Sequence, residues 1–556
     1  MIHLQLFIVS DYWVNNKIGI YLKNMYKKTI LFSLFILTFS TITAVEKVNY
    51  LVPNKLKGVG YSAHTELTWE NRMGFIYDIY RSDDGNSNFS KIAQTGSNRY
   101  MDFFGKQIQK EQTFYYRILP KGLSVNDKNA AKFEVTVPVR PANDSDLLDM
   151  AQRYTTRYFY DFADPVTGMA RERSNDVNGN IVTVGGSGFG IMALIAGAER
   201  NYYSRDDAFK TINKIVSFLE KTERFHGAWS HWYNGNTGKA FSFSQFDDGG
   251  DLVETAFMME GLLTAREYFR NGSLNEQALA KRITQLWETV EWNWYTQGKD
   301  ALYWHWSKNY GFKLNHRITG FDETLITYVL AASSPTFPIK QTVYEKGYTK
   351  SNYFLNGKKY YGIKLDLGMD FGGPLFFTHY SFIGLNPTGL TDKYTNYFER
   401  NRAHALIQVA YATDNPKKHT GYGPACWGFT SSDDPINGYT SHQPGTTDEN
   451  GTVSPTAALA SVVYTPKESI AALRYFYYTK GNILLGEYGF YDAFNAGLVD
   501  GQQVVHSYLA IDQGPIAVMI ENYRSGLLWK LFMGNPEIHK GLDRLGFKTL
   551  PNKIQD

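Results

Sequence analysis

A short stretch rich in carboxylates is the most evident candidate for a catalytic or binding site in this sequence. The stretch 241–263 holds four acids around two glycines: Asp247, Asp248, Gly249, Gly250, Asp251 and Glu254. Apolar residues follow at helical spacing, so a helix is predicted to begin near Asp251. Clustered carboxyls suit acid–base chemistry. The alternative is a capping box, in which Asp251 and Glu254 accept hydrogen bonds from free backbone amides, and the spacing leaves both interpretations open.

Two further acidic positions stand at the start of predicted apolar helices. Asp322 and Glu323 open the segment FDETLITYVLAA, and Asp512 is the lone acid of AIDQGPI. Each could simply compensate the helix dipole or cap the helix. An acid at such a position would also be partly desolvated, which raises its pKa as a general acid requires.

The long segment 413–454 is rich in polar side chains but matches no standard site. Cys426 and His442 lie sixteen residues apart without a context that stabilises a thiolate, which disfavours a nucleophile–base pair. Its acids could bind calcium, although EF-hand spacing is absent: Asp433, Asp434, Asp448 and Glu449. The sequence also lacks zinc spacing, a phosphate loop and a dinucleotide fingerprint.

The elements that must position these residues repeat along the chain. A Gly- or Pro-bearing loop followed by a short, apolar helix occurs six times: 185–198, 249–263, 320–332, 372–385, 454–463 and 512–523. Amphipathic helices are predicted between them, for example at 147–162, 206–222, 274–292 and 391–412. Six buried and six covering helices predict an (α/α)6 barrel over residues 145–550. The helix starts would gather the acids, together with His379 and Trp427, at one mouth.

The preceding region predicts a separate β domain. Residues 45–140 contain alternating strands separated by turn signals, with Trp69 in an early strand and Tyr115-Tyr116-Arg117 in a late one. This pattern resembles a fibronectin type III sandwich. No catalytic constellation is present in it.

Composition and the first residues predict an exported protein. Residues 1–44 are expected to be a signal region whose true start is Met25, because Lys27-Lys28 precede an apolar run and a small-residue end. The single cysteine excludes an internal disulfide. A net charge of +3 gives no field that points to nucleic acid. We expect a periplasmic or secreted monomer that is free of the membrane once the signal is removed.

Several motifs in order carry a family resemblance. FSQFDDGGDLVETAFMMEGLLTA, TGFDETLITYVLAASSP, GGPLFFTHYSFIGLNP, ACWGFTSSDDPINGY and LLGEYGFYDAFN resemble the bacterial glucoamylase-like (α/α)6 glycoside hydrolases. They are most similar to the β-1,2-glucanases of glycoside hydrolase family 144, over about residues 145–540. The resemblance implies an inverting hydrolase of β-1,2-glucan or its oligosaccharides, without a metal cofactor. Family members include endo enzymes and exo enzymes that release sophorose.

The resemblance also assigns roles to residues. Glu323 corresponds to the general acid and Asp512 to the candidate base. The predicted substrate-binding residues are Asp247, Asp251, Glu254, Asp322, His379 and Trp427. Aromatic residues, 16% of the chain, would stack on sugar rings.

A geometric expectation accompanies these roles. Helices packed about 10 Å apart in a ring of six place opposite axes roughly 20 Å apart. Side chains of Glu323 and Asp512 that each reach about 6 Å inward would leave a gap of about 8 Å. Inverting enzymes separate their carboxyls by roughly 6.5–9.5 Å.

Two other classes stay open at this stage. One is a glycan-binding protein of the same fold without catalytic activity. The other is a hydrolase or lyase that acts on another polysaccharide, for which His379-Tyr380 could supply a lyase pair.

Overall fold

The computed structural model describes residues 54–70, 74–85, 88–176 and 179–549. The chain divides into two compact units, Met1–Pro141 and Ala142–Asp556, which are described separately. The expected signal region, residues 1–44, lies outside the described residues. Among the helices that are described, none combines the length and the apolar character needed to cross a bilayer.

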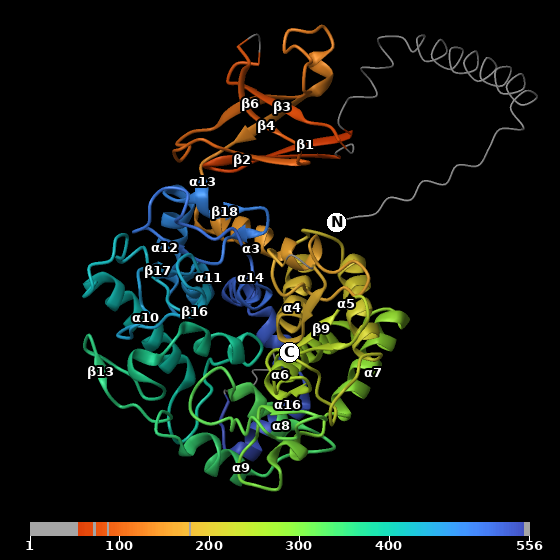
Figure 1. The fold of residues 1–556 in the computed structure, drawn as a ribbon, viewed down its shortest axis with the longest axis vertical. Coiled ribbons are helices and arrows are strands. Elements are labelled where there is room, and N and C mark those ends of the chain that lie inside the picture. The colour runs from red at the N-terminus through yellow and green to blue at the C-terminus, as the bar shows by residue number, and fades with distance from the viewer. Residues whose placement is uncertain (1–53, 71–73, 86–87, 177–178, 550–556) are drawn as a thin grey trace, which may run out of the picture. The chain divides into compact units, whose positions relative to one another are not determined.

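The N-terminal unit consists of two antiparallel sheets (Figure 1). The first has the order β1-β2-β5, with strands Asn54–Gly60, His64–Glu70 and Arg99–Phe103. The second has the order β4-β3-β6-β7, with strands Ser90–Thr95, Tyr77–Ser82, Gln112–Pro120 and Glu134–Val139. Alternate side chains of both sheets form its core, including Leu67, Trp69, Tyr77, Ile79 and Tyr116.

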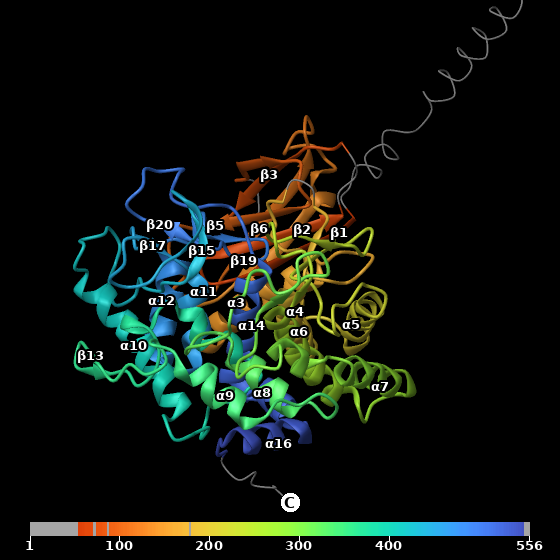
Figure 2. The same cartoon turned by 60° about the horizontal axis from the view of Figure 1, so that its bottom comes forward.

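The C-terminal unit is helical (Figures 1 and 2). Its α-helices are α3 (Asp144–Tyr160), α4 (Val184–Glu199), α5 (Arg205–Leu219), α6 (Leu252–Phe269), α7 (Leu274–Glu288), α8 (Leu325–Ser333), α9 (Gln341–Lys346), α10 (Tyr397–Asp414), α11 (Pro455–Ala460), α12 (Pro466–Tyr478), α13 (Gly481–Leu484), α14 (Ala510–Ser525), α15 (Leu527–Met533) and α16 (Pro536–Leu545). Short two- to four-residue strands form ribbons between them.

Five of the six expected apolar segments form α-helices: α4, α6, α8, α11 and α14. The fourth, residues 372–385, instead forms the 3-10 turns η5 (Asp370–Gly372), η6 (Leu375–Thr378) and η7 (Tyr380–Phe382). Its start cannot be helical because Phe371, Gly372 and Gly373 all have positive φ angles, of 56°, 100° and 79°. The sequence pattern overlooked this break.

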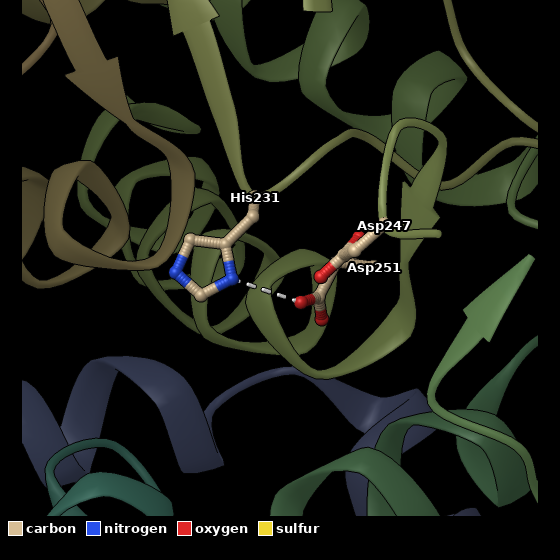
Figure 3. Close-up of side chains that lie close together, drawn as sticks. All are labelled: His231, Asp247 and Asp251. Atoms are coloured by element: carbon tan, nitrogen blue, oxygen red, sulfur yellow. Dashed lines mark hydrogen bonds and ion pairs between the residues drawn. The ribbon is translucent and has the colours of Figure 1, made fainter. Parts of the chain in front are cut away.

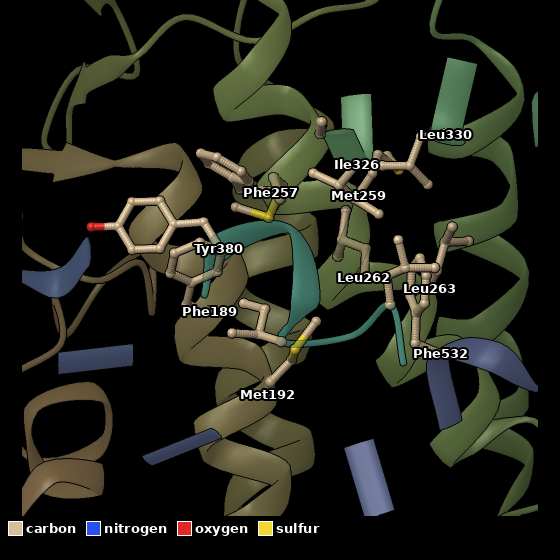
Figure 4. Close-up of a cluster of buried hydrophobic side chains, with 14 of the residues drawn as sticks. Phe189, Met192, Phe257, Met259, Leu262, Leu263, Ile326, Leu330, Tyr380 and Phe532 are labelled. Carbon is tan, nitrogen blue, oxygen red and sulfur yellow. The ribbon is translucent and has the colours of Figure 1, made fainter. Parts of the chain in front are cut away.

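Helices α4 and α6 pack backbone against backbone at two glycines. A Cβ atom added to Gly261 would lie 2.1 Å from the carbonyl oxygen of Gly188, and one added to Gly188 would lie 2.2 Å from that of Phe257. The glycine run of α4 therefore permits close helix packing. Figure 4 shows the apolar cluster beside this contact, with Phe189 and Met192 of α4, Phe257 and Met259 of α6, and Ile326 of α8.

Candidate active site

A pocket of about 390 Å³ opens where the loops before α4, α6, α8 and α14 meet. Three acids lie on its wall: Glu172, Glu254 and Glu323. Aromatic side chains make up much of the rest: Trp232, Phe243, Phe257, Trp304, Phe376, Tyr380 and Tyr439. Arg173, Thr183, His231, Leu509 and Ile511 complete the lining. Flat apolar walls with few polar groups are typical of a small-ligand site.

Glu254 reaches the pocket from the first turn of α6. Asp251 caps this helix, because its Oδ1 accepts hydrogen bonds from the amides of Val253 and Glu254 at 3.0 and 2.9 Å. Glu254 does not complete a capping box. Its Oε2 instead accepts from the amide of Gly185 at 2.7 Å, at the start of α4. The capping interpretation therefore holds for Asp251, while the Glu254 carboxyl faces the pocket.

Two histidines join this acidic cluster. His231 Nδ1 lies 3.0 Å from Asp251 Oδ2, and its Nε2 lies 3.8 Å from Glu254 Oε1. His305 Nε2 lies 3.2 Å from Asp247 Oδ2 and 3.5 Å from Asp251 Oδ2. Figure 3 shows His231, Asp247 and Asp251 converging from adjacent segments. Backbone pairing sets the arrangement, since β11 (Gly250–Asp251) places Asp251 opposite His305 of β12 (His305–Trp306).

The members of this cluster have pKa values that are shifted in different directions. Burial alone would raise the pKa of Asp251, but hydrogen bonds from His231 and His305 outweigh it and hold that pKa well below its usual value. Burial would lower the pKa of His231, yet the charge of Glu254 and the hydrogen bond to Asp251 raise it to about 9. Burial raises the pKa of Glu254 to about 7. Asp251 is thus ionised and His231 is protonated at neutral pH.

This cluster is an ion-pair network by its chemistry. Ligand atoms of His231, Asp247 and Asp251 lie within 4.8 Å of one another, close enough to hold a metal ion. A protonated imidazole, however, has no free lone pair for a metal. The observed separations are also those of direct hydrogen bonds and ion pairs.

Glu323 lies in the turn just before α8, two residues earlier than the helix itself. Its carboxyl lines the pocket. Burial, followed by the charge of neighbouring Asp322, raises the pKa of Glu323 well above its usual value. A raised pKa favours the protonated form of the carboxyl, which proton donation to a leaving group requires.

Asp512 lies behind the pocket wall, in the first turn of α14. It is 1% exposed and does not cap its helix. Its Oδ1 accepts a hydrogen bond from the hydroxyl of Tyr380 at 3.3 Å, and Tyr380 itself lines the pocket. The Tyr380 ring packs on Phe189 and Phe257 while its hydroxyl points out of that apolar cluster (Figure 4). Burial and the charge of Asp492 raise the pKa of Asp512 well above its usual value.

Of the eight predicted site residues, all of them described, Glu254 and Glu323 reach the pocket wall. Asp247 and Asp251 lie close to His231, and Asp512 accepts a hydrogen bond from Tyr380. His231 and Tyr380 both line the pocket. The Asp322 carboxyl turns back to accept from the amide of Thr324 at 3.0 Å. It acts on the site through its charge on Glu323.

His379 and Trp427, also predicted to bind substrate, are buried and are not among the residues that line this pocket. His379 is buried, and its Nε2 lies 3.0 Å from the Ser461 hydroxyl. Burial lowers the pKa of His379 to about 3, which leaves the ring neutral. Trp427 is fully buried and donates to the carbonyl of Glu468 at 3.4 Å.

The acids of the long segment 413–454 are distributed among separate partners. Asp433 pairs with Arg173 at 3.0 Å, Asp434 accepts from Asn450 at 2.6 Å, and Glu449 pairs with Lys417 at 3.0 Å. They do not converge on one cation. Cys426 is buried, which raises its pKa to about 12, so it is not a nucleophile.

Sequence reasoning overlooked His231, His305 and Tyr380. The two histidines occur in His-Trp pairs, His231-Trp232 and His305-Trp306. A repeated basic–aromatic dipeptide near acidic loops is a signal that could have identified them. Tyr380 was noted only as part of a lyase alternative, and its contact with Asp512 depends on the tertiary fold.

A carboxyl with a raised pKa beside other acids, in a pocket walled by aromatic rings, is the arrangement of a glycoside hydrolase. Comparison with known proteins agrees. Residues 315–536 match the family model Glycoamylase, described as "Putative glucoamylase". An exo β-1,2-glucooligosaccharide sophorohydrolase (non-reducing end) of Parabacteroides distasonis is 41% identical over 531 residues, covering 91% of this chain and 72% of the relative.

Solved structures give the same result. An endo-β-1,2-glucanase from Chitinophaga pinensis, in complex with sophorotriose and glucose, is 49% identical with a TM-score of 0.71, over 73% of this chain and 99% of that one. A β-1,2-glucanase from Parabacteroides distasonis is 40% identical with a TM-score of 0.80, over 89% and 73%. The chain therefore belongs to the glucoamylase-like family of these β-1,2-glucan-degrading enzymes, which confirms the resemblance noted from its motifs.

Proposed function

We propose that this chain is a glycoside hydrolase that cleaves β-1,2-glucan or β-1,2-gluco-oligosaccharides with inversion of the anomeric carbon. The observation that carries the proposal is Glu323 on the pocket wall, where burial and the charge of Asp322 raise the pKa of its carboxyl. Family membership supplies the substrate class, because the relatives above act on β-1,2-linked glucose.

Glu323 is the general acid in this account. Its proton passes to the glycosidic oxygen as the bond from that oxygen to C1 breaks. A water molecule attacks C1 from the opposite face. Its oxygen bonds to C1, and its proton passes to the Tyr380 hydroxyl while the Tyr380 proton passes to Asp512. Glu323 regains a proton from solvent after the products leave, and Asp512 returns one.

The other pocket residues hold the sugar. Glu254 and His231 offer an acceptor and a charged donor side by side, and Asp251 with Asp247 keeps His231 and His305 charged. Trp232, Phe243 and Trp304 supply flat faces for glucose rings. Asp322 raises the pKa of Glu323 without contacting substrate.

Several further features belong to the proposal. The alternation of buried and amphipathic helices supports an (α/α)6 barrel. The division of the N-terminal unit into three- and four-stranded sheets supports a fibronectin type III-like sandwich over residues 45–140. The charged, apolar and small-residue order of residues 25–44 supports export as a periplasmic or secreted monomer.

The lyase alternative is less well supported, because the His379 side chain is hydrogen-bonded to Ser461 and does not line the pocket with Tyr380. A direct test incubates the protein with β-1,2-glucan and, separately, with a uronate-containing polysaccharide, and follows reducing ends together with the ultraviolet absorbance of an unsaturated lyase product. Hydrolysis predicts reducing ends without new absorbance. New absorbance would indicate a lyase, and neither signal would indicate a glycan-binding protein. The earliest products separate the two activities of the relatives: disaccharide alone means exo action.

A further inference from the structure

The 3-10 turn η7 contacts both residues to which the proposed function assigns proton transfer. The hydroxyl of Tyr380 donates to Oδ1 of Asp512 at 3.3 Å. The hydroxyl of the next residue, Ser381, donates to the backbone carbonyl oxygen of Glu323 and accepts from the amide of Ile326 at 3.0 Å. Two consecutive side chains of one short turn therefore reach the candidate base and the candidate acid.

Ser381 supplies the cap that helix α8 does not obtain from its own N-terminal residue. A helix leaves its first amides without intrahelical partners, and the residue before it often accepts from one of them. Thr324 occupies that position but does not cap the helix, and its hydroxyl donates to the Asp322 carboxyl instead. Ser381 accepts from the Ile326 amide in its place. The hydrogen of the Ser381 hydroxyl goes to the Glu323 carbonyl, so one hydroxyl binds the backbone on both sides of the helix start.

The segment that follows Ser381 is bound to helices α6 and α14. Oε1 of Glu260 in α6 accepts from the amide of Gly384 at 2.9 Å. The side-chain amide of Asn522 in α14 donates to the carbonyl of Ile383 at 2.8 Å. Ser381 is 0% exposed, so bulk water does not compete for its hydrogen bonds. The hydroxyl therefore links the start of α8 to two other helices, one of which carries the candidate base.

We propose that Ser381 is a positioning residue of the general acid, because its hydroxyl fixes the backbone of Glu323 and with it the place of the carboxyl at the glycosidic oxygen. This inference rests on the proposed function of Glu323. Ser381 is not among the residues that line the pocket, so it acts through Glu323. A displacement of a reacting group by about 1 Å can lower a rate by a factor of about 10².

The test compares two substrates that differ in their need for a general acid. The sugar leaving group of a β-1,2-gluco-oligosaccharide must receive a proton as it departs. In β-sophorosyl fluoride the bond from C1 to fluorine breaks and fluoride, a weak base, departs without that proton. For Ser381→Ala we expect kcat on the oligosaccharide to fall about 10- to 100-fold with little change in KM. On the fluoride, kcat should change by less than about threefold.

A second variant and a matched control accompany this comparison. Ser381→Cys replaces the hydroxyl by a thiol, which is a weaker donor and acceptor, so the same selective loss is expected to a smaller extent. Ser333 is another buried serine, at the other end of α8, whose hydroxyl donates to the carbonyl of Val329 at 2.7 Å. Ser333→Ala should leave the ratio of the two rates unchanged.

An equal loss on the two substrates would assign Ser381 a general role in the fold and overturn the inference. Unchanged kcat on the oligosaccharide would overturn it too, as would failure of both Ser381 variants to fold. Glu323→Gln separates this inference from the proposed function, because that variant should show a larger loss with the same selectivity. Without selectivity in Glu323→Gln, the general-acid role itself fails. Selectivity in Glu323→Gln alone would refute only the positioning role of Ser381.

Discussion

The Nδ1 atom of His231 lies 3.0 Å from Oδ2 of Asp251, the residue that caps helix α6 through its other oxygen. One carboxylate therefore fixes both the start of the helix that carries Glu254 and the orientation of a charged imidazole on the pocket wall. Its loss would disturb fold and site together. Mutation of Asp251 consequently removes the helix cap together with the ion pair, whereas mutation of its partner His231 leaves the cap in place.

Replacement of His231 by Asn should remove a pH-dependent part of the stability. The folded-state pKa of His231 is raised to about 9 from 6.5, so its contribution is complete below about pH 6.5 and is lost as the pH rises through about 9. The whole shift corresponds to roughly 3 kcal/mol. Denaturant unfolding at pH 7 and at pH 10 should give a large difference between variant and wild type at the first pH and a small one at the second.

His226→Asn is the control for this experiment. His226 forms a more exposed ion pair with Glu291 at 3.0 Å, and pairs of that kind contribute little. A difference for His231→Asn that is equal at the two pH values would show that the imidazole acts only by packing.

Glu323→Gln should abolish hydrolysis and leave the fold intact. The amide keeps the shape of the acid, and the raised pKa of Glu323 favours an uncharged carboxyl, so the replacement disturbs the local charge little. The expected loss in kcat is about 10²–10⁴-fold, the usual contribution of a general acid. The melting temperature should change little. Turnover near the wild-type level would instead show that Glu323 has a purely structural role at the start of α8.

Gly185→Ala should impair the site without adding any polar group. The new Cβ would lie 2.6 Å from Oε2 of Glu254, the atom that accepts from the Gly185 amide. Glu254 must then move, and we expect a rise in KM of about tenfold, the result of losing about 1.4 kcal/mol of binding. Gly423→Ala is a suitable control, because a Cβ added there meets nothing within 4 Å. Unchanged kinetics for Gly185→Ala would mean that the Glu254 position does not matter for substrate binding.

The sequence predicted some features better than others. Helices α4, α6 and α14 were predictable because their apolar residues and glycines extend over whole buried segments. The segment 372–385 has the same composition, yet positive φ angles at Phe371, Gly372 and Gly373 break it into 3-10 turns. Pattern alone does not report backbone dihedrals.

Some site residues could likewise be predicted from the sequence and others could not. Glu254 and Glu323 could be predicted because they stand at helix starts in acidic motifs. The pairing of His231 with Asp251, and of Asp512 with Tyr380, joins residues 20 and 132 positions apart through tertiary contacts. Local spacing carries no information on such contacts, which explains why His379 and Trp427 looked equally eligible.

The most direct test of the central claim is proton NMR of the first product formed from β-1,2-glucan. With Glu323 as acid and Asp512 as base on opposite faces of the sugar, water replaces the leaving group with inversion. The account predicts that the new reducing end appears first as the α-anomer and only later mutarotates. A β-anomer in the earliest spectra, or no cleavage of β-1,2-glucan, would contradict it.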